Sequence, residues 1–470
     1  MRRLGWVLLM TMACGDAEPA ADEVQKPAEW PEVWGPPQIA EDENPDPNIV
    51  EVTLEATRTT VTLDGEPIEM LAYNGSVPGP LIRVRKGNEL IVHFRNGLDE
   101  PTTIHWHGLR IPADMDGSPR VIDPVQPGAE YTYHFTVPDA GSYWYHPHVR
   151  AHVQVEAGLY APLIVWDDKD PEYDAERYLV LDDILIDSGE RPPPLENGQE
   201  RMFGRYGNLL LQNGQSEPLA FTLEQGHVER WRFVNAANAR TMRLRMKGAS
   251  FRVIGTDGGL LPEPRALSKS AGVEQLTITA GQRFDVEVTA DQAGVITMES
   301  ELNPGEWVQV LEAEVTASDR APRTVEWPPI ELPAREADAK ESITIDAVNA
   351  SGGIEWRLNG VAHRDEPLFT FPEGHTVDLT LDNTIGPEHP FHVHGQFFQV
   401  LNDDAQPGLK DTVLVPGFSK VKIRAYFDNP GRWMAHCHIL EHAELGMMAD
   451  IVVTPKDGSA VPPPASGHQH

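Results

Sequence analysis

The sequence predicts an all-β protein made of three similar β-sandwich domains. Short alternating apolar runs, separated by Gly, Pro and Asn, recur along the chain, and a spaced Asn-Gly motif occurs three times. Helical periodicity is scarce, which favours sandwiches or barrels over mixed folds. A chain of 470 residues is also too long for one hydrophobic core.

The strands are predicted from short runs such as residues 90–94, 131–135 and 377–381. These runs are rich in apolar, β-branched and aromatic residues, and turn-forming residues bound them. Successive side chains of a strand point to opposite faces, so runs of this kind suit strands with one buried face.

The domain count follows from an internal repeat. In each copy, Asn-Gly leads to a glycine, and an Asn follows that glycine after nine residues. We interpret each copy as a strand, a glycine turn and a second strand that ends at the Asn. The copies begin at Asn74, Asn213 and Asn359, continue at Gly87, Gly226 and Gly374, and end at Asn96, Asn235 and Asn383. We therefore expect domains at residues 48–170, 175–320 and 338–456, with the Pro-rich residues 321–337 as a linker.

The first 14 residues have the pattern of an export signal. Arg2 and Arg3 precede an apolar run that ends before Cys14 and is too short to span a bilayer. Cys14 resembles the lipidation site of a bacterial lipoprotein, although Thr11 stands where that motif has leucine. The arginine pair also suggests twin-arginine export. We expect an exported protein, periplasmic or at the cell surface, whose membrane contact is limited to a lipid anchor at Cys14.

Composition constrains the two ends and the partners. Residues 15–47 predict a flexible, acidic, Pro-rich tether, and residues 457–470 predict a disordered tail. The net charge of −34 argues against nucleic acid as a partner, because phosphates would be repelled. Only Cys14 and Cys437 are present, so the mature body has no disulfide and Cys437 is free for chemistry. We expect a monomer.

Histidines recur in His-x-His pairs that keep the repeat register. With 18 histidines in 470 residues, random placement predicts about one such pair, whereas five are present, one of them in the tail. Strand side chains alternate, so both imidazoles of a pair point to one face. Eight imidazoles of the outer domains are therefore predicted to converge on one shared metal cluster, while the middle domain lacks histidines at these positions. The eight are His105, His107, His146, His148, His392, His394, His436 and His438.

Cys437 lies between His436 and His438, so its sulfur points to the opposite face of the strand. Together with His389, His442 and Met447, it offers a thiolate, two imidazoles and a thioether. This set is typical of a blue-copper site with a long axial Met, and the thioether argues against zinc, the competing metal. The alternative for Cys437 is a buried, inert thiol. An electron at this site would have only the short backbone path through His436 and His438 to the cluster.

These motifs, in this order, resemble those of the multicopper oxidases, specifically the three-domain, laccase-like bacterial members. The resemblance covers nearly all of residues 50–455 and implies three cupredoxin-like Greek-key β-sandwich domains in tandem. It also implies four copper ions per chain, one-electron oxidation of a reducing substrate and reduction of dioxygen to water. By resemblance, type 1 copper takes His389, Cys437, His442 and Met447, type 2 takes His105 and His392, and the type 3 pair takes His107, His146, His148, His394, His436 and His438.

Two acidic positions bear on proton supply. Asp116 matches the acidic position that these enzymes use near the cluster, although a turn-forming Asp before Gly117 is an equal alternative. Related bacterial enzymes often have a Glu directly after the residue that corresponds to His442, and this chain has Ala443 there, followed by Glu444.

The reducing substrate is left open between two classes. A laccase would oxidise phenols or aromatic amines, whereas a metallo-oxidase would oxidise Cu(I), Fe(II) or Mn(II). The 12 methionines form no Met-rich run, which favours the laccase, while the acidic composition keeps the metal-ion alternative. A cupredoxin limited to electron transfer would lack cluster ligands, and none is missing here. A two-domain copper nitrite reductase is disfavoured for a similar reason.

Overall fold

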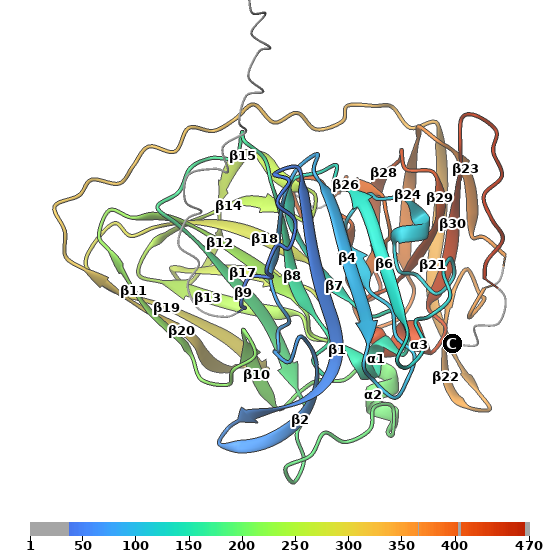
Figure 1. Cartoon of the computed structure of the whole chain (residues 1–470), viewed down its shortest axis with the longest axis horizontal. Helices are drawn as coiled ribbons and strands as arrows, with labels where there is room; N and C mark the ends of the chain where they lie inside the picture. Colours follow the sequence, from blue (N-terminus) through green and yellow to red (C-terminus); the bar gives the residue numbers. More distant parts are fainter. Residues whose placement is uncertain (1–36, 365, 403–405, 466–470) are drawn as a thin grey trace, which may run out of the picture. The chain divides into compact units, whose positions relative to one another are not determined.

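Residues 37–364, 366–402 and 406–465 are described by the computed structural model shown in Figure 1. Within these ranges the strands form six sheets, two in each third of the chain. This arrangement confirms the predicted all-β class and the tandem sandwiches. The predicted export signal, with Cys14, lies outside the described residues.

The first sandwich packs a sheet of order β2-β1-β4-β6 against a sheet of order β3-β8-β7-β5. Trp106, Tyr133 and Tyr145 are fully buried between the two sheets. Its loops hold the 3-10 helix η1 (Ala113–Met115) and helix α1 (Ala151–Gln154). The strands are β1 (Ile49–Leu63), β2 (Glu66–Tyr73), β3 (Ile82–Arg85), β4 (Glu89–Asn96), β5 (His105–His107), β6 (Glu130–Thr136), β7 (Gly141–His146) and β8 (Ala161–Trp166).

The second sandwich has sheets of order β10-β9-β12-β18-β14-β15 and β11-β20-β19-β13-β17-β16. Helix α2 (Gly198–Phe203) lies in the connection between its first two strands. The strands are β9 (Ala175–Ile184), β10 (Leu209–Gln212), β11 (Leu219–Glu224), β12 (Val228–Asn235), β13 (Met242–Lys247), β14 (Ser250–Thr256), β15 (Gly259–Ala266), β16 (Ser268–Ser270), β17 (Val273–Ile278), β18 (Arg283–Thr289), β19 (Gly294–Asn303) and β20 (Glu306–Thr316).

The third sandwich has sheets of order β22-β21-β24-β28-β26 and β23-β30-β29-β25-β27. Helix α3 (Leu440–Glu444) connects its last two strands. The strands are β21 (Ala339–Ala350), β22 (Gly353–Leu358), β23 (Phe369–Pro372), β24 (His375–Asn383), β25 (His389–Val393), β26 (Phe397–Val400), β27 (Thr412–Val415), β28 (Lys420–Phe427), β29 (Gly431–Cys437) and β30 (Met448–Thr454).

The three sandwiches share one topology. In each, the first strand pairs antiparallel with the second and parallel with the strand that ends at the repeat Asn. The parallel pairs are β1 with β4, β9 with β12 and β21 with β24. The second sheet of each sandwich also pairs its first strand parallel with its last. The repeat read from the sequence therefore corresponds to a repeated fold.

The repeat Asn stabilises the same corner in each sandwich. Asn96, Asn235 and Asn383 are buried, and each side-chain amide donates to one carbonyl of the loop that follows and to a carbonyl of a more distant segment. Each side-chain oxygen also accepts from the backbone N–H two residues later. In the outer sandwiches this loop leads directly into the histidine-bearing strand, so the motif helps to position the metal ligands.

Both connecting segments make backbone contacts with the sandwiches. Within the predicted tether, Ala40 donates to the carbonyl of Leu81 at 2.8 Å, and Ile39 forms a β-bridge with Leu81. In the linker, the Trp327 indole donates to the carbonyl of Leu261 at 3.1 Å. These hydrogen bonds join both segments to the sandwiches.

The predicted tail behaves in the same way where the structure describes it. Residues 457–465 have no regular secondary structure. Even so, the Ala465 N–H donates to the Arg120 carbonyl at 3.0 Å, and the Arg432 guanidinium donates to the Pro462 carbonyl at 3.3 Å. In the described ranges no helix is long and apolar enough to cross a membrane.

Candidate metal centre

Two short antiparallel strand pairs carry the predicted histidine ligands. In the first sandwich, β5 pairs with β7 so that His105 lies opposite His146. In the third sandwich, β25 pairs with β29 so that His392 lies opposite His436. The ligands of the two outer sandwiches therefore sit at corresponding places. The other four, His107, His148, His394 and His438, lie on these strands or within two residues of their ends.

Imidazole rings of the two outer sandwiches interleave at a buried interface. The ring centroids of His105 and His394 are 3.9 Å apart, as are those of His107 and His392, and both pairs stack. The Nε2 atoms of His394 and His436 lie 3.1 Å apart. The structure thus brings all eight predicted cluster residues together. Their ligand atoms fall into triplets with all atoms within 4.8 Å: His105, His107 and His392; His105, His148 and His394; His107, His146 and His438; His392, His394 and His436.

Several of these rings present a buried nitrogen that bonds to no group among the described residues. Burial, together with neighbouring imidazoles, holds the pKa of His146, His148 and His438 well below its ordinary value. Neutral imidazoles with unused lone pairs are typical ligands of transition metals, and buried nitrogens without partners would otherwise be costly. The donor set therefore fits copper. The unpartnered atoms are Nε2 of His105, His146, His148 and His392, Nδ1 of His107, and both ring nitrogens of His438.

Asp116 lies between ligands from two sandwiches. It is buried, its carboxylate accepts from His394 Nδ1 at 2.9 Å, and its backbone carbonyl accepts from His105 Nδ1 at 2.9 Å. Burial acts to raise the pKa of Asp116, but the imidazoles of His105 and His394 outweigh it, and the net pKa lies below the ordinary value. Asp116 also directly follows η1, where its backbone N–H donates to the Ala113 carbonyl at 3.3 Å before Gly117. Asp116 therefore occupies a turn and contacts two ligands at once.

Asp411 makes a second carboxylate contact with the cluster. Its Oδ1 accepts from His107 Nε2 at 3.2 Å, and its backbone carbonyl accepts from His392 Nδ1 at 2.9 Å. These bonds leave Nδ1 of His107 and Nε2 of His392 to face the cluster. Such outer contacts fix the tautomer and orientation of a metal-binding histidine.

Cys437 and its predicted partners form a second site on the other face of β29. The Cys437 Sγ lies 3.5 Å from His389 Nδ1 and 3.8 Å from His442 Nδ1, and the two ring nitrogens are 3.2 Å apart. Met447 is buried in the same core, where its N–H donates to the carbonyl of His442 and its carbonyl accepts from the N–H of Cys437. The four residues thus come from β25, the end of β29, α3 and the position just before β30.

The chemistry of this second site also fits a soft metal ion. Burial raises the pKa of the Cys437 thiol, so a thiolate here requires a bound cation. For His389, burial has the opposite effect and lowers the pKa to about 3, which keeps the imidazole neutral. A thiolate with two neutral imidazoles and a nearby thioether is the donor set of blue copper.

The middle sandwich covers this site with α2. His442 is fully buried, and its Nε2 donates to the carbonyl of Met202 at 3.2 Å. Trp356 packs against the His442 ring with centroids 4.0 Å apart, and its indole donates to the carbonyl of Arg201 at 2.9 Å. Two carbonyls of α2 therefore close the outer edge of the cysteine site.

Models of the multicopper oxidase family match residues 55–170, 175–305 and 335–457, which together make up most of the chain. The chain belongs to the multicopper oxidase family. It is 32% identical over 445 residues to the multicopper oxidase MmcO of Mycobacterium tuberculosis, with 85% of this chain and 86% of the relative covered.

Solved structures agree with this assignment. A multicopper oxidase from Campylobacter jejuni, described as a metallo-oxidase, matches with a TM-score of 0.78 and 29% identity over 91% of this chain and 96% of its own. A laccase from Pediococcus acidilactici matches with a TM-score of 0.77 and 28% identity over 91% of this chain and 94% of its own. This multicopper oxidase is therefore a copper-binding oxidoreductase with oxygen as acceptor.

The sequence of this multicopper oxidase did not reveal three of the residues around the two sites. Asp411, Trp356 and Met202 lie outside the repeat register, and their roles depend on contacts between distant segments. Met202 acts through its backbone carbonyl, which no sequence pattern marks. Asp411 directly precedes β27, but an Asp before a strand is too common to be a signal.

Proposed function

We propose that this multicopper oxidase takes single electrons from a small donor, with metal ions as the first class, and passes them to dioxygen. When bound, copper supplies one-electron transfer at the cysteine site and dioxygen reduction to water at the histidine cluster. We assign one ion to His389, Cys437, His442 and Met447 and three to the cluster, with His105 and His392 holding the type 2 ion and the other six histidines holding the type 3 pair.

The chain itself provides a short path between the two sites. Cys437 is bonded through the backbone to His436 and His438, so one strand carries ligands of both sites. In addition, the Nδ1 of His436 donates to the Cys437 carbonyl at 2.8 Å. This hydrogen bond offers a shorter route than the covalent path around the His436 backbone.

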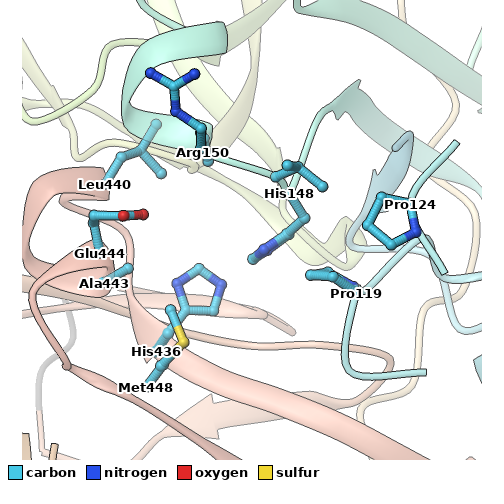
Figure 2. Close-up of a pocket in the computed structure, with 11 residues that line it drawn as sticks. Pro119, Pro124, His148, Arg150, His436, Leu440, Ala443, Glu444 and Met448 are labelled. Atoms are coloured by element: carbon cyan, nitrogen blue, oxygen red, sulfur yellow. The ribbon is translucent and has the colours of Figure 1, made fainter. Parts of the chain in front are cut away.

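A pocket of about 80 Å³ supports access of dioxygen to the cluster. Two cluster ligands, His148 and His436, lie on its wall, as Figure 2 shows. Ala443 and Glu444 also line it, and Glu444 is the acidic residue of this wall. We infer that Glu444 supplies protons to the cluster, in place of the Glu that related bacterial enzymes often have at the position of Ala443. The remaining lining residues are Pro119, Pro124, Val149, Arg150, Ala151, Leu440 and Met448.

The bond from His442 Nε2 to the Met202 carbonyl is the observation that favours a metal ion as the electron donor. A bulky phenol cannot contact the His442 edge while α2 covers it, because the imidazole is fully buried. A small ion needs less room and is attracted by a chain with a net charge of −34. The related metallo-oxidase from Campylobacter jejuni is consistent with this choice.

A laccase-like activity towards phenols or aromatic amines is the second candidate. Phe203 on α2 and Tyr206 just beyond it are 49% and 44% exposed, so an aromatic donor could stack on the outside of the cover. Electrons would then reach His442 through α2 rather than by direct contact. The absence of a Met-rich run in the sequence also favours this candidate.

The cellular setting is part of the proposal. The arginine pair, the short apolar run and Cys14 support export to the periplasm or cell surface, with a lipid anchor as the membrane contact. We propose that the protein acts there as a monomer.

Oxygen uptake by the copper-loaded protein tests the proposal. Cu(I) and Fe(II) would be supplied in one series and an electron-rich phenol in another, with a chelator holding free copper low in the phenol series. Prompt uptake with the metal ions and slow uptake with the phenol supports the metallo-oxidase. Fast phenol-driven uptake that ignores the chelator would make the protein a laccase, and no uptake with any donor would refute both candidates.

A further inference from the structure

The middle sandwich, although it has no predicted copper ligand, contributes one side chain to the surroundings of the cluster. Arg283 is the first residue of β18 and is fully buried. Its guanidinium forms a bidentate pair with Asp411 of the third sandwich, with Nη1 2.8 Å from Oδ1 and Nη2 2.5 Å from Oδ2. Asp411 is the carboxylate that contacts His107 and His392.

The remaining donors of Arg283 are all engaged. Nε donates to the Ser142 carbonyl at 3.0 Å, Nη1 to the Gly281 carbonyl at 3.0 Å, and Nη2 to the Asp257 carbonyl at 3.1 Å. A guanidinium has five N–H groups in a rigid planar fork, so this set of acceptors fixes its position. Arg283 thus joins all three sandwiches, because Ser142 belongs to the first.

The guanidinium and the cluster ligands are closely packed against glycines of the neighbouring loops. A Cβ added at Gly108 would lie 2.3 Å from Arg283 Nη2 and 2.6 Å from Asp411 Oδ2. A Cβ added at Gly281 would lie 2.9 Å from the His438 ring and 3.1 Å from the His107 ring. The segment that presents Arg283 therefore rests directly on cluster ligands.

We propose that Arg283 is a positioning residue for the trinuclear cluster, which it orients by holding Asp411 against His107 and His392. Without the guanidinium, the Asp411 carboxylate would be a buried charge lacking its main partner and would be free to turn away from His107. The His107 ring would then lose the bond that directs Nδ1 towards the cluster. This inference rests on the cluster assignment made above, and it is independent of the electron donor.

The test compares copper-loaded Arg283→Gln and Arg283→Lys proteins with the wild type. We measure copper per chain after competition with a chelator, the electron paramagnetic resonance spectrum of the type 2 ion, and the visible absorption of the cysteine site. For Arg283→Gln we expect cluster copper affinity to fall 10- to 100-fold, the usual effect of losing an outer contact of a metal ligand, with an altered type 2 spectrum and unchanged visible absorption. Arg283→Lys keeps the charge without the fork, so we expect partial rescue.

Arg230 provides a matched control. It is also a fully buried arginine of the middle sandwich, and it pairs with Asp285 at 2.6 Å without contacting a cluster ligand. Arg230→Gln should lower stability yet leave the type 2 spectrum unchanged. Equal loss of cluster copper in Arg230→Gln, or a wild-type cluster in Arg283→Gln, overturns the proposal.

A variant that fails to fold and a failure of the proposed function can both be told apart from a failure of this proposal. If Arg283→Gln does not fold, Arg283→Lys decides, since wild-type affinity and an unaltered type 2 spectrum in that variant also overturn the proposal. If the wild type itself binds no cluster copper, it is the proposed function that fails.

Discussion

Asp116 of the first sandwich and His394 of the third share a hydrogen bond of 2.9 Å across their interface. The same residue accepts from His105 through its backbone carbonyl. One acidic residue thus contacts a ligand on each side of the cluster. Reduction of dioxygen consumes protons, and the Asp116 carboxylate directly contacts the cluster ligand His394.

Replacing Asp116 with Asn therefore tests a role in proton supply. The amide keeps the size of the side chain but cannot carry a proton, so we expect Asp116→Asn to slow dioxygen turnover by roughly 10- to 100-fold. Reduction of the cysteine site by the donor should keep its wild-type rate. Stopped-flow absorption separates the two steps, and equal slowing of both would count against the role.

Cys437→Ser tests the assignment of the second site. Because the thiolate is the source of the visible colour in a blue-copper site, the variant should lose nearly all of that absorption and its oxidase activity. Copper at the histidine cluster should remain detectable by electron paramagnetic resonance. Persistent colour in Cys437→Ser would mean that another residue supplies the chromophore.

Because α2 covers His442, we expect the size of the electron donor to affect how fast it is oxidised. Trp356→Phe removes the indole N–H that donates to the Arg201 carbonyl, a bond worth about 1 kcal/mol. We expect kcat/KM for a bulky phenol to rise several-fold as α2 loosens, with less than about a two-fold change for a small outer-sphere donor, on the same energy scale. Steady-state oxygen uptake with both donors makes the comparison.

Trp327→Phe is the matched control for that experiment. It also removes an indole N–H that donates to backbone carbonyls, but it does so in the linker, at Leu261 and Pro262. If Trp327→Phe changed phenol oxidation as strongly as Trp356→Phe, the effect would reflect general loosening of the protein rather than the cover.

Asp182 predicts a pH dependence of stability. Burial and, next, the Asp183 carboxylate raise the pKa of Asp182 to about 7. An acid with a raised pKa in the folded state binds its proton more tightly there than in the unfolded chain, so stability falls as pH rises from about 4 to about 7. Each pKa unit corresponds to ~1.4 kcal/mol.

Asp182→Asn removes that ionisation. We expect the variant to be more stable than the wild type at pH 8, by a few kcal/mol at most, with the difference shrinking towards pH 4. Chemical denaturation of the metal-free protein at both pH values measures it. A difference that is the same at pH 4 and pH 8 would show that Asp182 does not titrate in this range.

The sequence predicted those parts of the fold that repeat. Asn96, Asn235 and Asn383 mark equivalent corners because each bonds a carbonyl of its own loop four or five residues later, a local interaction that leaves a fixed spacing in the chain. The histidine pairs were found for the same reason, since a strand dictates their spacing. Both features depend on neighbours in sequence.

Contacts between sandwiches leave no fixed spacing in the sequence. Arg283 meets Asp411, and His442 meets the carbonyl of Met202, where different sandwiches pack against one another. Their partners lie far away in the chain, so neither spacing nor composition marks them. The contacts of the connecting segments leave no pattern either, because their composition does not reveal that Ala40 or Trp327 finds a backbone partner on a sandwich.

The interleaving of His105 with His394 and of His107 with His392 has a consequence for biosynthesis. The ribosome makes the first member of each pair long before the second, and β29 is among the last strands to emerge. A nascent polypeptide that ends before the last residues of β29 therefore lacks His436 and His438 and cannot complete the histidine cluster. Under the proposed function, reduction of dioxygen is thereby confined to chains whose synthesis and folding are complete.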